Sequence, residues 1–175
     1  MRLITVAATV GVFAGVLCAQ SSYIGADKCA KMCHKAPAKG EQLTIWKKSK
    51  HAQAYATLAT PAALETAKKA GVTGDPQKSE KCLKCHTTGA WSTAKKDSTL
   101  TAEGVSCEAC HGAGSGYAKL NVMKDKKASL AAGMIEPDEK ACVQCHNAES
   151  PNFTGFVFAD MAKKIAHPKP APAAK

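Results

Sequence analysis

The stretch that decides the fold is CEACH at residues 107–111, in which two cysteines stand three positions apart and a histidine follows the second. The same pattern recurs as CLKCH at residues 82–86 and as CVQCH at residues 142–146. A fourth copy, CAKMCH at residues 29–34, has one extra residue between its cysteines. One short motif, repeated four times without a fixed period, therefore organises this chain.

The spacing within each copy has a geometric meaning. Two thiols about one helical turn apart can form thioethers with the two vinyl groups of a haem, and the adjacent histidine then presents its imidazole to the iron. The motifs therefore predict four covalently attached haem c groups, the first on a less common, longer variant. The predicted attachment sites are Cys29, Cys33, Cys82, Cys85, Cys107, Cys110, Cys142 and Cys145. The predicted proximal iron ligands are His34, His86, His111 and His146.

Paired cysteines also serve in zinc ribbons, in redox dithiols and in disulfides. Zinc ribbons and redox dithiols use Cys-x-x-Cys pairs, and exported proteins use disulfides. None of these three requires a histidine directly after the second cysteine in all four copies. The repeated histidine therefore favours haem.

The composition agrees with an interior that a cofactor fills. The chain has 175 residues, enough for one domain, but aromatic residues make up only 5% of it. Such a chain builds a conventional core with difficulty. We expect an all-α fold with much irregular chain, a small multihaem cytochrome wrapped around four closely packed haems.

Residues 1–19 are typical of a signal peptide, because Arg2 precedes an apolar run that is too short for a comfortable membrane span and Ala19 suits cleavage. An uncleaved anchor is the alternative. A lipoprotein site at Cys18 is disfavoured, because Leu17 rather than a small residue precedes it. Cleavage after Ala19 removes the odd cysteine. We expect a periplasmic or extracellular protein that meets the membrane only transiently during export.

The remaining chain divides into two parts. The tetrahaem domain is expected over residues 20–167, and the Pro- and Ala-rich segment 168–175 is expected to be an extended, mobile tail. Within the domain, helices are expected at 45–58, from Pro61 to Gly71, at 125–133, from Pro137 into the fourth motif, and at 160–167. Strand patterns are weak throughout.

The formal net charge is +10, and lysine supplies nearly all of the excess. Nucleic-acid binding is disfavoured, because Arg2 is the only arginine and arginine is the usual reader of bases. Each haem would bring two propionates. We therefore expect the scattered lysines largely to balance the charge of the cofactors.

Two of the six histidines, His51 and His167, lie outside the motifs. Because four haems need sixth ligands, we predict that both are axial ligands rather than surface residues. Two haems then take a methionine, another ligand, water or nothing. Met123 is the preferred methionine, because a loop could close the distance from the third motif; Met32, Met134 and Met161 are alternatives, and packing is the commoner role for each.

The segments WKKSKHA at residues 46–52 and GVSCEACHGAGS at residues 104–115, with the spacing of the four motifs, resemble the cytochrome c-554 family of multihaem cytochromes. The resemblance implies closely stacked haems in a largely helical protein that relays electrons between redox enzymes. In that family a histidine that ligates a haem often follows the Gly-Ser pair. Tyr117 occupies that neighbourhood here, so this ligand does not carry over. Tyr117 is expected to pack, with ligation or hydrogen bonding as alternatives.

The sequence thus predicts an electron carrier, without catalytic residues, whose partners are other redox proteins or cytochromes. A homo-oligomer is possible, but it would not relieve the shortage of histidine ligands, since each added chain brings haems and spare histidines in the same ratio. The main alternative is a reductase that acts on a small molecule at an open iron, but that needs acid–base groups beside the iron. A haem-based sensor or structural subunit is a further alternative, and a filament of haems with two histidines each is disfavoured by the histidine shortage.

Overall fold

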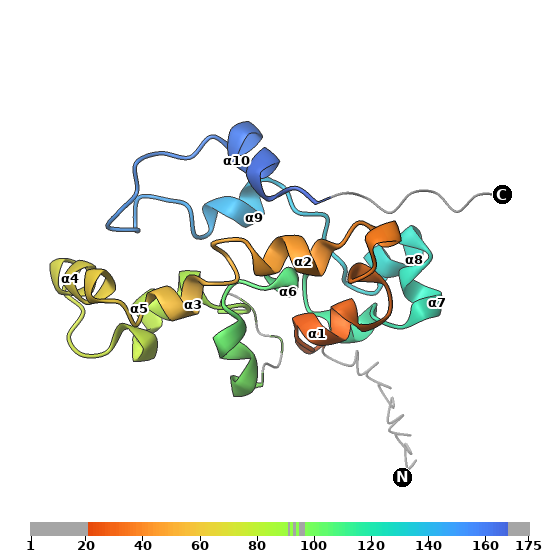
Figure 1. Cartoon of the computed structure of the whole chain (residues 1–175), viewed down its shortest axis with the longest axis horizontal. Helices are drawn as coiled ribbons and strands as arrows, with labels where there is room; N and C mark the ends of the chain where they lie inside the picture. The colour runs from red at the N-terminus through yellow and green to blue at the C-terminus, as the bar shows by residue number, and fades with distance from the viewer. Residues whose placement is uncertain (1–20, 91, 93, 95–96, 168–175) are drawn as a thin grey trace, which may run out of the picture.

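The computed structural model describes residues 21–90, 92, 94 and 97–167. Short helices joined by irregular chain make up this part of the protein, and no β-strand occurs in it (Figure 1). The all-α fold expected from the sequence is confirmed. The expected signal peptide and the expected tail lie outside the described residues.

The helices are all short, and none of those in the described part is long and apolar enough to cross a membrane. The α-helices are α1 (Ala26–Cys29), α2 (Gln42–Lys47), α3 (Ala54–Thr57), α4 (Pro61–Lys69), α5 (Glu80–His86), α6 (Cys107–His111), α7 (Leu120–Met123), α8 (Lys126–Ala131), α9 (Glu139–Val143) and α10 (Phe158–Ile165). A π-helical turn, η1 (Ala30–His34), follows α1. The 3₁₀ turns are η2 (Pro37–Lys39), η3 (Pro76–Lys78), η4 (Ser98–Glu103) and η5 (Gly114–Gly116).

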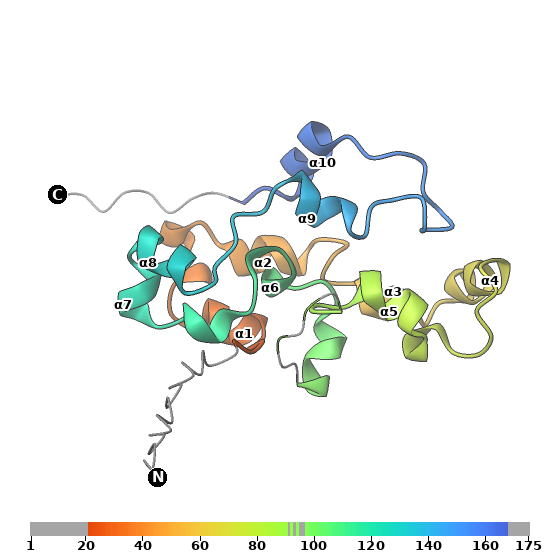
Figure 2. The same ribbon diagram turned by 180° about the vertical axis from the view of Figure 1, so that it is seen from behind.

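The helices form an elongated molecule. Figure 1 shows α4 at one end and α1, α7 and α8 at the other, with α2 and α6 between them and α9 and α10 along one side. The view from behind keeps this separation (Figure 2). Spatial order differs from chain order, because α6 of the third motif packs against α1 of the first.

The apolar core is small. It centres on the buried side chains of Ala26, Ala30 and Leu43, against which Trp46 and Cys107 pack. The Trp46 indole N–H donates to the carbonyl of Val105 over 2.8 Å and so ties α2 to the chain before the third motif. Two of the three core side chains are alanines, which bury little apolar area, so this cluster alone is a weak source of stability.

Local signals placed several helices correctly. Thr60 caps α4 by accepting from the N–H of Ala63, and Asp138 caps α9 by accepting from Ala141. Asp125 caps α8 in the same way. The last helix, α10, begins two residues earlier than expected and ends at Ile165, before His167.

The single helix expected over residues 45–58 is wrong. α2 ends at Lys47, α3 begins at Ala54, and the chain between them turns. The carbonyl of His51 accepts from the backbone N–H groups of both Ala54 and Val105, and a tertiary hydrogen bond of this kind takes that carbonyl out of a helix. The amphipathic spacing that suggested one helix is thus overridden by a contact with the chain before the third motif.

Candidate haem-binding sites

Each motif lies on a short helical turn. The first occupies the end of α1 and η1, the second the last turns of α5, and the third all of α6. The fourth begins in α9, and His146 lies in the turn that follows. Residues three or four positions apart on a helix are neighbours, so each pair of cysteines can reach one flat cofactor. Nothing is described of the Met32 and Cys33 side chains.

Three motif histidines are oriented by their second ring nitrogen. A metal-binding histidine commonly donates one ring N–H to a carbonyl, which fixes the ring and leaves the other nitrogen for the metal. The Nδ1 atoms lie 2.7 Å from the Ala54 carbonyl for His86, 3.1 Å from the Ile135 carbonyl for His111, and 3.3 Å from the Gln42 side-chain oxygen for His34. These partners only accept, so Nδ1 carries the proton and Nε2 keeps its lone pair for an iron.

The two histidines outside the motifs each face a motif histidine. The ring centres of His51 and His146 lie 6.0 Å apart, and those of His111 and His167 lie 6.1 Å apart. Phe156 stacks on the His146 ring with a centre-to-centre distance of 4.8 Å and so helps to fix that ring. Among the described residues, neither His34 nor His86 is paired with a second histidine ring.

The separation of the paired rings fits two ligands on one metal. With a metal–nitrogen bond of about 2 Å and a ring centre roughly 1 Å behind the nitrogen, two imidazoles on opposite sides of one metal have centres about 6 Å apart. Both observed pairs meet this value. The residues present therefore fit a haem at the third and at the fourth motif, with His167 and His51 as the respective second ligands.

The surroundings of His51 favour its ligating form. Burial and, to a lesser degree, the neighbouring His146 lower the pKa of His51. The neutral imidazole is the form that binds a metal. The backbone holds the ring in place, because the His51 carbonyl accepts from Val105 over 3.0 Å.

Contacts between the motifs bring the first beside the third. Cys29 and Cys107 are both half-buried and lie near one another. The carboxylate of Glu108, which is 2% exposed, accepts from the backbone N–H groups of Ile24 and Gly25 just before α1. It also accepts from the Gly114 N–H over 2.6 Å. One side chain of the third motif therefore holds both the segment that follows this motif and the segment just before α1.

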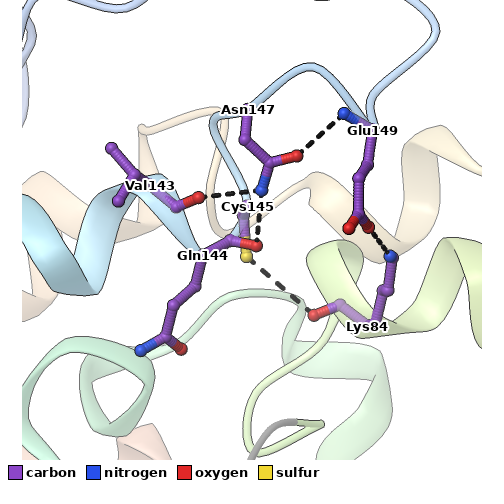
Figure 3. Close-up of polar contacts among 6 residues, drawn as sticks. All are labelled: Lys84, Val143, Gln144, Cys145, Asn147 and Glu149. Carbon is purple, nitrogen blue, oxygen red and sulfur yellow. Dashed lines mark hydrogen bonds and ion pairs between the residues drawn. The ribbon is translucent and has the colours of Figure 1, made fainter.

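The fourth motif lies between the third and the second. Cys110 is close to both Cys142 and Cys145, and the thiols of Cys85 and Cys145 form a hydrogen bond. Figure 3 shows the second and fourth motifs meeting, with Cys145 over the Lys84 carbonyl and the Lys84 ammonium paired with Glu149. The motifs therefore form a row in the order first, third, fourth, second.

Three of the motif thiols, those of Cys29, Cys85 and Cys107, are not activated. Burial, with the carboxylate of Glu108 and the nearby Cys107, raises the pKa of Cys29 to about 12, and mainly burial raises that of Cys107 to about 11. The hydrogen bond with Cys145, followed by burial, raises the pKa of Cys85. A reactive redox thiol has a lowered pKa. These thiols therefore lack the signature of a dithiol oxidoreductase.

Tyr117 is buried, and its hydroxyl donates to the carbonyls of His111 and Gly112 at 3.0 and 2.7 Å. The expectation that it packs is met, with a hydrogen bond to the end of the third motif in addition. Met123 is half-buried at the end of α7. Its role as a ligand stays a prediction.

Sequence reasoning missed Glu108 and the backbone carbonyls of Ala54 and Ile135. An acidic residue between two cysteines expected to lie against a haem was an available signal, because a buried carboxylate needs partners. A backbone carbonyl is present at every residue, so its role in orienting a histidine leaves no mark in the sequence.

The comparison with known families matches these sites. Residues 28–112, which contain the first three motifs and His51, match the family described as cytochrome c554 and c-prime. No curated protein and no solved structure was found to match the chain. With motifs, oriented histidines and family match in agreement, the chain is a c-type cytochrome that resembles the cytochrome c554 family, an electron carrier that binds haem c covalently and has redox proteins as its partners.

Proposed function

We propose that this cytochrome carries four haems and works as an electron carrier outside the cytoplasm. The observation that carries the proposal is the pairing of His51 with His146 and of His167 with His111 at about 6 Å. The fourth motif lies outside the family match, and its histidine nevertheless has a second ring opposite it. This supports a haem at that motif as well as at the first three.

The haem supplies a reversible one-electron change at its iron, and the protein determines how readily that change occurs through ligand identity, hydrogen bonding and burial. The chain supplies the ligands and fixes their orientation. The acceptors at Ala54, Ile135 and Gln42 hold the rings of three motif histidines, and Phe156 packs on the fourth. An arrangement fixed in this way suits a carrier, because a site that changes little between its two states reacts without large rearrangement.

The row of motifs supports a relay rather than separate sites. Neighbouring motifs lie close to one another through their cysteines, from Cys29 and Cys107 at one end to Cys145 and Cys85 at the other. The first and second motifs stand at the ends of the row. Their histidines, His34 and His86, are the two without a paired ring among the described residues. The sixth ligand of each of these two haems would be Met123, another group or water, or the position would stay open.

The location outside the cytoplasm rests on the sequence. Residues 1–19 have the pattern of a signal peptide, and covalent haem attachment is compatible with the thiols of an exported chain. The intact mass of the purified, secreted protein tests both parts of the proposal. We expect a chain that begins after Ala19 and carries the mass of four haems, and the double variant Cys142→Ala/Cys145→Ala should lose the mass of one haem. A mass with fewer than four haems in the unmodified protein contradicts the proposal.

The ligand assignment has its own test. Replacing His51 by alanine should convert one haem from low spin to high spin, measured by electron paramagnetic resonance. The same substitution in the Cys142→Ala/Cys145→Ala background should convert none, because the haem that His51 serves is already absent. Gln53→Ala, in the same turn but exposed, is the matched control. An unchanged spectrum in the single variant, or an equal change in both backgrounds, would show that His51 does not ligate the fourth-motif haem.

A further inference from the structure

A pocket of about 370 Å³ lies beside the first motif. Its apolar lining comes from Ala30 and Leu43, which are 3% and 6% exposed and belong to the core cluster. Its polar lining is a set of charged side chains from the first motif and α2: Asp27, Lys28, Lys31, Lys35 and Lys47. The pocket therefore combines a small apolar floor with a largely cationic rim.

The charge of this rim is partly compensated, because Asp97 lies near Lys28 and Glu103 lies near Lys47, both outside the lining. Lys47 pairs with Asp27 at 4.0 Å, but both side chains are exposed, and an exposed pair of this length contributes little. Asp27 is the one acidic side chain against four lysines in the lining. The remaining lysines of the rim are exposed as well.

The rim is part of a wider charge asymmetry. Residues 27–50 contain seven lysines and two acidic residues, whereas residues 97–138 contain four lysines and six acidic residues. The two propionates of a haem at the first motif would leave the segment 27–50 positive. A positive surface of this kind attracts an anionic partner over a distance and raises the rate of encounter.

We propose that the lysine-rimmed pocket beside the first motif is the docking site for an acidic redox protein. The lysines meet carboxylates of the partner above a floor formed by the buried Ala30 and Leu43. Electron-transfer encounters are small and short-lived, so a pocket of this size is sufficient.

The position of the pocket agrees with this role. The first motif stands at one end of the row of motifs, so a partner that docks there reaches the row at its terminus. The inference rests on the proposed function, because docking for electron transfer requires a haem at the first motif. A lysine cluster that only neutralises propionates is the alternative, and the experiment separates the two.

The test uses the haem-loaded protein and an acidic [2Fe–2S] ferredoxin as the electron-donating probe, with the rate of haem reduction followed by stopped-flow absorbance. The variant Lys28→Glu/Lys35→Glu/Lys47→Glu should slow reduction at low ionic strength by about tenfold or more, and the difference should vanish at high salt. Lys28→Arg/Lys35→Arg/Lys47→Arg keeps the charge and should react like the unmodified protein.

A matched control separates the patch from net charge. Lys68→Glu/Lys69→Glu/Lys164→Glu changes three exposed lysines on α4 and α10, away from α1 (Figure 1). It should leave the rate within about twofold of the unmodified rate. Equal slowing in both reversal variants, or no slowing in the first, overturns the docking site and supports simple charge balance.

The same samples distinguish failure of the docking site from failure of the proposed function. Intact mass reports the number of haems in each variant, whatever its rate. A reversal variant that keeps four haems and reacts at the unmodified rate removes the docking site and leaves the four-haem carrier intact. Fewer than four haems in the unmodified protein contradicts the proposed function whichever variant reacts faster.

Discussion

Glu108 lies between Cys107 and Cys110, and its carboxylate is almost completely removed from solvent. It accepts from Ile24 at 3.0 Å, from Gly25 at 2.8 Å and from Gly114 at 2.6 Å. A buried carboxylate is tolerated only when it is satisfied in this way. The side chain therefore joins the first and third motifs in a protein whose apolar core is small.

Replacing Glu108 by glutamine should destabilise the protein. The amide nitrogen cannot accept a hydrogen bond, so at least one of the three backbone donors loses its partner and the charge assistance is lost. We expect the free energy of unfolding to fall by about 1–3 kcal/mol, measured by denaturant titration with circular dichroism. Glu103→Gln is the matched control, because Glu103 accepts from Ala26 alone among the described residues and is half-buried. Equal losses in the two variants would show that Glu108 has no special role.

The turn between α2 and α3 is the element that places His51. Gly104 contacts it closely, since a Cβ atom at Gly104 would lie 2.7 Å from the His51 carbonyl oxygen. Gly104 also has a φ of +69°, which side chains other than glycine adopt with strain. The loop before the third motif and the turn that carries His51 thus fit together only with glycine at this position.

We expect the substitution Gly104→Ala to disturb ligation of a haem by His51. The added methyl group must displace the His51 turn, so part of the low-spin signal of one haem should be lost in the electron paramagnetic resonance spectrum. Gly71→Ala is the control, because Gly71 has a nearly equal φ of +68° but nothing within 4 Å of the added methyl group. Both variants should lose stability, because side chains other than glycine adopt a positive φ with strain, but only Gly104→Ala should change the spectrum. A spectrum unchanged in both variants would refute the role of Gly104.

Across the whole molecule, the four sites are unequal. Two motif histidines face a second ring, and two do not within the described residues. They also differ in their second-nitrogen partners, which range from backbone carbonyls for His86 and His111 to a side-chain amide for His34. Ligand identity and hydrogen bonding tune the potential of a haem iron.

A redox titration followed by absorbance should therefore be much broader than a single one-electron step, since unlike sites have unlike potentials. The reduced protein should also bind carbon monoxide if the haem iron at the first motif (His34) or the second motif (His86) has no sixth ligand. Carbon monoxide binding with turnover of nitrite, hydroxylamine or peroxide would favour a reductase, whereas binding alone would not. A narrow titration with four equivalent low-spin haems would refute the inequality, because the chain has too few histidines to produce it.

The features that could be predicted from the sequence are local ones, in which residues a few positions apart interact. The spacing of cysteines and histidine acts within one helical turn, so the motifs and their covalent cofactor were predictable from single stretches such as residues 107–111. The caps of Thr60 and Asp138 were predictable for the same reason, because each acts on an N–H three residues away. The supply of histidines predicted that His51 and His167 are ligands. Each ring lies about 6 Å from the ring of a motif histidine, and ligation itself stays a prediction.

Only the tertiary structure decided which motif each spare histidine faces, the order of the motifs in the row, and the break between α2 and α3. His51 reaches His146, and Glu108 reaches Ile24, across large separations in the chain. Such contacts depend on how the chain folds back on itself. The local helical pattern at residues 45–58 gave way there, because the His51 carbonyl bonds with Val105 and the ring is packed against the fourth motif.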